Sequence, residues 1–186
     1  MAQTYDLMAS ATADGSSDTI QFDAIPQTHD NLHFFLSIRS TTTTASTQTD
    51  LKVTPQTSSP WSANLAAYFI NYVSQADTSN YSSSTGTDNI NTIVRLPNSS
   101  SGSNFGSTAQ YFGCYRIDFP EYSLDGQNKG FYMYGGCITD ATYFGASSQA
   151  NGNVRVVGPF VQVTFEVNNG NFVSGSRIRM YGSSNS

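Results

Sequence analysis

The chain has 186 residues and a formal net charge of −5, and only 11% of its residues are charged. Soluble domains usually contain about 25% charged residues. The only lysines are Lys52 and Lys129, and no basic run is present. The chain therefore cannot neutralise a line of phosphates, and we expect no direct binding of nucleic acid. No apolar stretch reaches the length of a membrane span, so we expect no membrane partner.

The composition favours antiparallel β-structure. Ser, Thr, Asn and Gly are abundant, whereas glutamate occurs only at Glu121 and Glu166. Such residues support strands and turns better than helices. Short strand-like runs separated by turn signals are typical of a sandwich or a barrel. We predict an all-β protein, an antiparallel β-sandwich, with one domain over residues 1–182 and a disordered tail over 183–186.

The first quarter of the chain contains three predicted strands. Tyr5–Ala9 opens as a strand, and Asp14-Gly15 predicts a turn. Apolar and polar residues alternate over 20–24, which predicts a half-buried strand with Ala24 as its last inward position. The more apolar segment Leu32–Ile38 predicts a central strand.

The middle of the chain carries weaker signals. The Thr- and Ser-rich segment 41–50 predicts a long loop, and a short strand follows near 51–53. Residues 64–73 fit both helical spacing and strand alternation. The polar segment 74–89 predicts a second long loop, before a further strand over 90–96.

The second half shows clearer patterns. Predicted strands cover 110–119, 130–139, 154–157, 160–167 and 176–181. Asp125-Gly126 predicts a turn in the hairpin between the first two of them. Gly135-Gly136 predicts a strand bulge rather than a ligand loop. We expect Cys114 and Cys137 to be free, buried thiols, because the sequence opens without a secretory leader pattern and the cytoplasm is reducing.

Few residues offer catalytic or metal chemistry. His29 and His33 are four residues apart, but no third ligand lies nearby in the sequence, and zinc needs three or four. Glu121 and Glu166 would have to face each other to act as a glycosidase pair, and nothing brings them together. A Ser–His–Asp triad is possible by residue count alone. We predict no enzyme activity, no catalytic residues, no metal and no cofactor.

Aromatic residues are frequent, with 12 Phe and 11 Tyr. Four adjacent pairs would place one ring on each side of a strand: Phe34-Phe35, Tyr111-Phe112, Phe131-Tyr132 and Tyr143-Phe144. The inward member of each pair is expected in the core, and the outward member would contact another subunit or a sugar. Trp61, the single tryptophan, is predicted to cover an end of the sandwich or to anchor an interface.

Three segments resemble a family of virion structural proteins of tailed phages, common in cyanophages and other aquatic phages. They are the opening segment 5–9 with 20–32, the middle segment Phe112–Lys129, and the closing segment Gly170–Gly182. They occur in the order that is typical of that family. The segment 41–109 carries no recognisable motif.

The resemblance implies a jelly-roll-like sandwich and a role as a capsid cement (decoration) protein. Such a protein sits on the outside of the phage head between capsomers, commonly as a trimer, and contacts the major capsid protein. It would be made in the host cytoplasm and function on the virion. The alternative is a receptor- or carbohydrate-binding domain of a head or tail fibre.

Arg177 and Arg179 alternate with apolar residues near the end of the chain, so both guanidinium groups are predicted on one strand face. Two interpretations stay open. The arginines form a solvated face, or they meet an acidic contact on the capsid or on a neighbouring subunit.

Overall fold

The computed structural model describes residues 4–41, 51–57, 67–75, 78–88, 112–138, 145–154, 158–167 and 170–185. Its strands form two antiparallel sheets that enclose one hydrophobic core, so the predicted all-β sandwich is confirmed. Within these ranges there is no helix, and hence none that could span a membrane.

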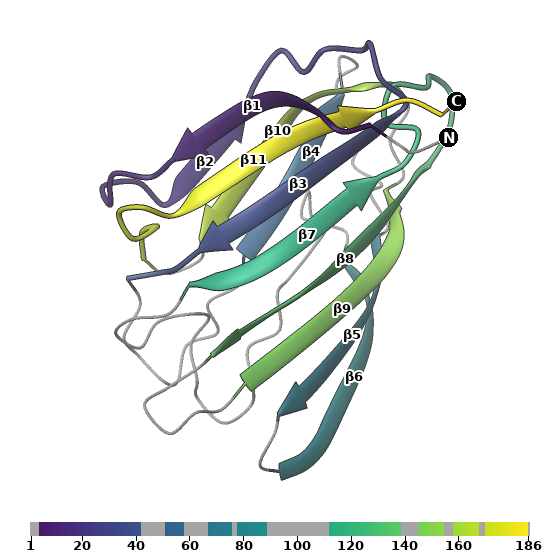
Figure 1. Ribbon diagram of the computed structural model, residues 1–186. Helices are drawn as coiled ribbons and strands as arrows, with labels where there is room; N and C mark the ends of the chain where they lie inside the picture. Colours follow the sequence, from purple (N-terminus) through teal and green to yellow (C-terminus); the bar gives the residue numbers. More distant parts are fainter. Residues whose placement is uncertain are drawn as a thin grey trace.

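The larger sheet contains eight strands. They are β1 (Asp6–Thr12), β3 (Asn31–Ile38), β5 (Ala67–Gln75), β6 (Thr78–Asp88), β7 (Gly113–Phe119), β8 (Lys129–Ile138), β9 (Gly145–Val154) and β11 (Arg177–Ser183). Their order across the sheet is β1-β11-β3-β7-β8-β9-β5-β6 (Figure 1). The last strand of the chain thus lies between two of the first, which joins both ends of the chain in one sheet.

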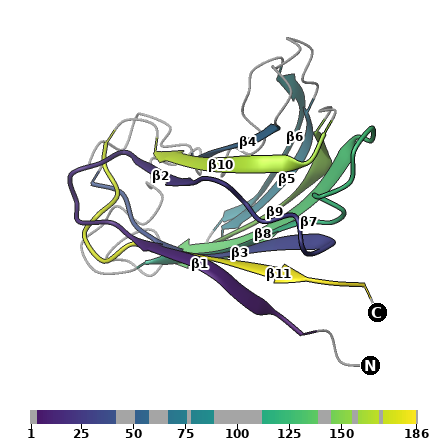
Figure 2. The same cartoon turned by 90° about the horizontal axis from the view of Figure 1, so that it is seen from above.

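The smaller sheet consists of β2 (Thr19–Phe22), β10 (Phe160–Val167) and β4 (Leu51–Thr57), in the order β2-β10-β4. Figure 2 shows it as a second layer over part of the larger sheet, which curves toward its β6 end. A jelly roll divides eight strands between two sheets, whereas the division here is eight and three. Jelly-roll connectivity stays a prediction.

Phenylalanine rings hold the two sheets together. Phe34 of β3 is fully buried, and its ring centroid lies 5.6 Å from that of Phe22 and 5.0 Å from that of Phe165, both in the smaller sheet. Phe119 of β7 meets Phe160 of β10 at 5.4 Å in an edge-to-face contact. Such pairs add about 0.5–1.5 kcal/mol beyond the burial of their area.

Most strands predicted in the first and last thirds of the chain are present. Leu32–Ile38 corresponds to β3, which pairs on both sides and is central as predicted. The predicted turn at Asp14-Gly15 is also confirmed, since Gly15 has a φ of 100° and Asp14 Oδ1 accepts a 2.8 Å hydrogen bond from the backbone N–H of Ser16. The ambiguous segment 64–73 is a strand where it is described, as part of β5.

Three local predictions are wrong. The predicted loop 74–89 contains β6, which pairs with β5 at the sheet edge. Backbone pairing at an edge needs no apolar pattern, so the Ser- and Thr-rich sequence gave no signal. Strand β9 was also not predicted, because its segment is equally polar; the predicted strand 154–157 shares only Val154 with it, and residues 155–157 lie outside the described residues. Ala24 is exposed with a φ of 50°, because β2 ends at Phe22 and Ile25 takes the inward position.

The predicted disordered tail 183–186 is ordered as far as Asn185. Ser183 is fully buried at the end of β11. The backbone N–H of Asn185 donates a 2.6 Å hydrogen bond to Asp30 Oδ2, and its side-chain oxygen accepts one from Asn31 at 3.0 Å. These partners lie just before and at the start of β3, so they extend the pairing of β11 beyond its apolar residues.

The predicted bulge at Gly135-Gly136 is also wrong. Both glycines pair in continuous register with Tyr115 and Cys114 of β7. Glycine is needed at 135 for a different reason: a Cβ atom there would lie 2.4 Å from the carbonyl oxygen of Cys114 and 2.4 Å from Cδ1 of Tyr115. The absent side chain lets the Tyr115 ring lie against the backbone of β8.

We expect Gly135→Ala to lower the free energy of unfolding by about 2 kcal/mol, because the clash involves backbone atoms that cannot move aside. Gly130→Ala, in the same strand, is the matched control: its Cβ would meet no atom closer than 3.9 Å. That variant should change stability by less than about 0.5 kcal/mol. Urea denaturation of both variants tests the difference, and equal effects would contradict the close-approach explanation.

Candidate functional site

The outer face of the larger sheet, which points away from the smaller sheet, is the most distinctive surface of the described chain. The strand register arranges its side chains in three rows that run from β1 across β11, β3 and β7 to β8. The first row contains Leu7, Tyr181, His33, Asp118 and Tyr132, the second Ser10, Arg179, Phe35, Arg116 and Tyr134, and the third Thr12, Arg177, Ser37, Cys114 and Gly136. We call these the polar row, the arginine row and the small row.

Large apolar side chains are exposed on this face. The exposed fraction is 60% for Leu7, 58% for Tyr132, 49% for Tyr134 and 37% for Phe35. Phe34 and Phe131, the neighbours of Phe35 and Tyr132, are buried, so the predicted inward and outward rings are confirmed for these two pairs. Phe112 is half-buried, whereas Tyr111, the pair 143–144 and residue 61 lie outside the described residues.

Arg116 occupies the centre of the arginine row. Its Nε donates a 2.7 Å hydrogen bond to Asp118 Oδ1, and its Nη2 donates one of 3.0 Å to the hydroxyl of Tyr5. The guanidinium carbon lies 5.1 Å from the ring centroid of Phe35 and 5.8 Å from that of Tyr134. These cation–π contacts hold Arg116 between its two row neighbours.

A buried hydrogen-bond network lies beside it. Nδ1 of His33 lies 2.6 Å from Asp118 Oδ1, to which it donates, and Nε2 of His33 lies within hydrogen-bond distance, 2.8 Å, of the hydroxyl oxygen of Ser183. This is the connectivity of a Ser–His–Asp triad, which sequence reasoning found only as a possibility of residue count. Ser183 has no exposed surface, however, so a substrate cannot reach its hydroxyl. The network therefore fastens β11, β3 and β7 to one another.

The charge of Asp118 depends on this network. Burial raises the pKa of Asp118, but hydrogen bonds from His33 and Arg116, with their charges, outweigh burial and hold it below its ordinary value of 3.8. The carboxylate is thus ionised in the folded protein at neutral pH and offsets the positive charge of Arg116.

Arg177 and Arg179 of β11 are both exposed on the outer face, which confirms that they share a strand face. In the described part of the chain, neither guanidinium lies within ion-pair distance of a carboxylate; Arg177 Nε donates only to Thr12 Oγ1, at 3.3 Å. The two arginines thus differ from Arg116, because their charge is not neutralised within the described residues.

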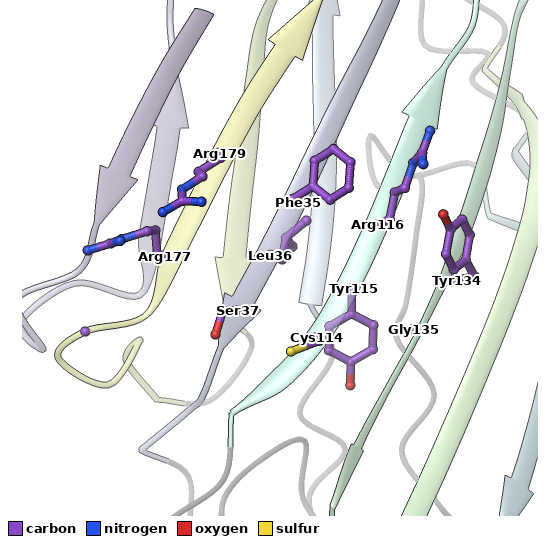
Figure 3. A pocket seen from close by; sticks show the side chains of 11 residues that line it. Phe35, Leu36, Ser37, Cys114, Tyr115, Arg116, Tyr134, Gly135, Arg177 and Arg179 are labelled. Atoms are coloured by element: carbon purple, nitrogen blue, oxygen red, sulfur yellow. The ribbon is translucent and has the colours of Figure 1, made fainter. Parts of the chain in front are cut away.

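A hollow of about 660 Å³ lies between these arginines and Arg116. Figure 3 shows Arg177 and Arg179 on one side of it and Arg116 with Tyr134 on the other. Two members of the small row explain the hollow: the side chains of Ser37 and Cys114, which line it, are short, whereas those of the arginine row beside them are long. No sequence motif marks this hollow, because it arises from the register of four strands.

Cys114 lines the hollow as a free thiol, and it is exposed. The free state agrees with the prediction, but the expected burial is wrong, since Cys114 occupies an outward position in β7. The side chain of Cys137 lies outside the described residues.

The other candidate residues do not converge. His29 pairs with Asp6 at 3.1 Å, whereas His33 pairs with Asp118. Glu121 follows β7 with a φ of 54°, and Glu166 lies in β10 of the other sheet. Among the described side chains, no group of three or more His, Cys, Asp or Glu could hold a metal ion.

The sequence matches no protein-family model, no curated protein and no solved structure.

We expect Asp118→Asn to lower the free energy of unfolding at pH 7 by about 1–3 kcal/mol, because hydrogen bonds to a charged partner are lost from a half-buried site. Since the folded pKa is depressed, the contribution of the carboxylate is complete above pH 3.8 and is lost as the pH falls through the folded value.

The difference between wild type and Asp118→Asn should accordingly shrink below about pH 4, as measured by denaturant titrations at successive pH values. Asp23→Asn serves as control, because the Asp23 side chain is exposed and is bonded only to the amide of Gln21. A difference that stays constant from pH 7 down to acid unfolding would refute the role assigned to Asp118.

Proposed function

We propose that the protein is a capsid cement protein of a tailed phage, which binds the outside of the head between capsomers and stabilises it. The observation that carries the proposal is the outer face of the larger sheet. It exposes Leu7, Phe35, Tyr132 and Tyr134 together with Arg177 and Arg179, which have no carboxylate partner among the described residues. Protein interfaces are enriched in aromatic residues and arginine and depleted in lysine and glutamate.

The kinds of charged residue on the outer face support a role as an interface. Of the fifteen positions in the three rows, only Asp118 is acidic, and none is lysine or glutamate. Burying such a face against a shell would require carboxylates on the shell opposite Arg177 and Arg179, while its exposed apolar area would contribute to binding. The partner proposed is the major capsid protein, with a homotrimer of this chain as the bound unit. In this role the protein acts without catalysis.

A receptor- or carbohydrate-binding domain of a fibre is the second candidate. It is favoured by Tyr132, whose ring is exposed beside Asp118 and could stack on a sugar. The rings of Phe35 and Tyr134 support it less, because each already has the guanidinium of Arg116 against it. Binding to a glycan array or to host cells would favour this candidate over the cement role.

Phage heads that lack the protein should release DNA at a lower temperature than complete heads, and adding the purified protein should restore their resistance. An immunogold label should decorate the head as a lattice. Labels confined to fibres, or equal heat resistance with and without the protein, would reject the cement role.

The outer face should carry this binding. We expect Tyr132→Ser to weaken binding to heads at least about tenfold, as for a central interface residue. Leu124→Ser removes a comparably exposed side chain, 41% exposed, from the segment between β7 and β8 and should leave binding unchanged. Cosedimentation with heads measures both, and a larger loss in Leu124→Ser would place the interface elsewhere.

A further inference from the structure

We propose that the hollow on the outer face binds an extended, acidic segment of a partner protein, with acidic side chains at alternate positions. This inference rests on the proposed function in taking the partner to be a protein. It adds the chemistry of the segment that is recognised and the residues that recognise it.

The arginines of β11 beside the hollow carry charge that no described carboxylate balances. Arg177 and Arg179 are both exposed and line the hollow, and within the described residues they have no carboxylate partner. The Asp118 carboxylate is already bonded to Arg116 and His33. Two guanidinium groups on one side of a hollow therefore favour a ligand that brings its own carboxylates, which arginine binds with two parallel hydrogen bonds.

The spacing of the two arginines matches that of side chains in an extended peptide. Arg177 and Arg179 are two residues apart in a strand, so they repeat at about 6.8 Å along the sheet. A peptide in extended conformation repeats its side chains on one face at the same interval. Acidic residues at positions i and i+2 of a segment lying along β11 would thus meet both arginines at once.

Aromatic rings lie on the side of the hollow that faces away from β11. Phe35 and Tyr134 flank Arg116, are partly exposed and line the hollow, while Ser37 and Cys114 form a low floor between the two sides (Figure 3). A peptide backbone fits this floor, and its other side chains would contact the aromatic edges. A sugar ring would need a free aromatic face, and Arg116 occupies a face of each ring.

The test uses the full chain and three eight-residue peptides, measured by titration calorimetry. The first alternates Glu and Thr, the second alternates Gln and Thr, and the third has the four Glu residues followed by the four Thr residues. We expect the alternating acidic peptide to bind most tightly, the block peptide more weakly, and the neutral peptide not at all. Binding should weaken as salt is raised.

Substitutions test whether the acidic peptide binds at the hollow. Arg177→Gln combined with Arg179→Gln should weaken binding of the alternating acidic peptide at least about tenfold. Lys52→Gln removes a positive charge from β4 of the other sheet and should change binding less than about twofold. Equal losses of peptide binding in the double arginine variant and in Lys52→Gln would show that net charge alone attracts the peptide, and would overturn the proposed site.

A thiol-alkylation readout reports occupancy directly. In a Cys137→Ser background, Cys114 is the only thiol, since the chain has two cysteines. The alternating acidic peptide should slow alkylation of Cys114 by iodoacetamide, and the neutral peptide should not. Binding without protection of Cys114 would place the peptide outside the hollow and overturn the inference.

Other outcomes separate this inference from the cement role. Binding of tetragalacturonate but not of the alternating acidic peptide would overturn the inference in favour of an acidic glycan. Heads that bind wild type and the double arginine variant equally would also overturn it, while leaving the cement role intact. Peptide binding at the hollow without any affinity for heads would support the inference and reject the cement role.

Discussion

The central strands of the larger sheet must bury one face completely, and this requirement determines what the other face displays. Phe34, Ile117 and Ile178 lie in three adjacent strands, and none of them has any exposed surface. Because side chains alternate in a strand, a slip of one residue would move arginines into this core. The register of the outer rows is thus set by the apolar residues behind them. The arginine spacing along β11 and the low floor of the hollow follow from the same register.

A hydrogen-bond network stabilises the outer side of the larger sheet, which the apolar core does not reach. His33, Asp118 and Ser183 lie on the outer side of the sheet, yet His33 and Ser183 are buried and hydrogen-bonded, and the ring of Tyr5 lies 4.8 Å from that of His33. A buried polar network stabilises a structure only when its members are satisfied. Here it ties the end of the chain to β3 and β7, and it also fixes Asp118 as the partner of Arg116. The arginine row, which borders the hollow, is therefore fixed both by the apolar core behind the sheet and by this network.

The sequence predicted those strands whose burial requires a pattern of apolar residues. The apolar residues of β3, β10 and β11 predicted these strands, and the adjacent aromatic pairs predicted one inward and one outward ring each, as found for Phe34-Phe35 and Phe131-Tyr132. Strands β6 and β9 were not predicted, because their segments are polar and backbone pairing requires no particular pattern of side chains. Of the candidate site, the shared face of Arg177 and Arg179 was predictable. The hollow was not, because it depends on which residues of β3, β7 and β8 lie opposite one another, and register between distant strands has no local signal.

The distribution of charge constrains how copies of the chain can assemble. The chain carries a net charge of −5, yet Arg177, Arg179 and Arg116 give the outer rows three positive charges against the single carboxylate of Asp118. If two copies met through this face about a twofold axis, their arginines would approach one another, and like charges in a desolvated interface oppose association. A homo-oligomer should therefore form through other surfaces, such as sheet edges. That arrangement would leave the arginine-bearing face of every copy available to a different, acidic partner.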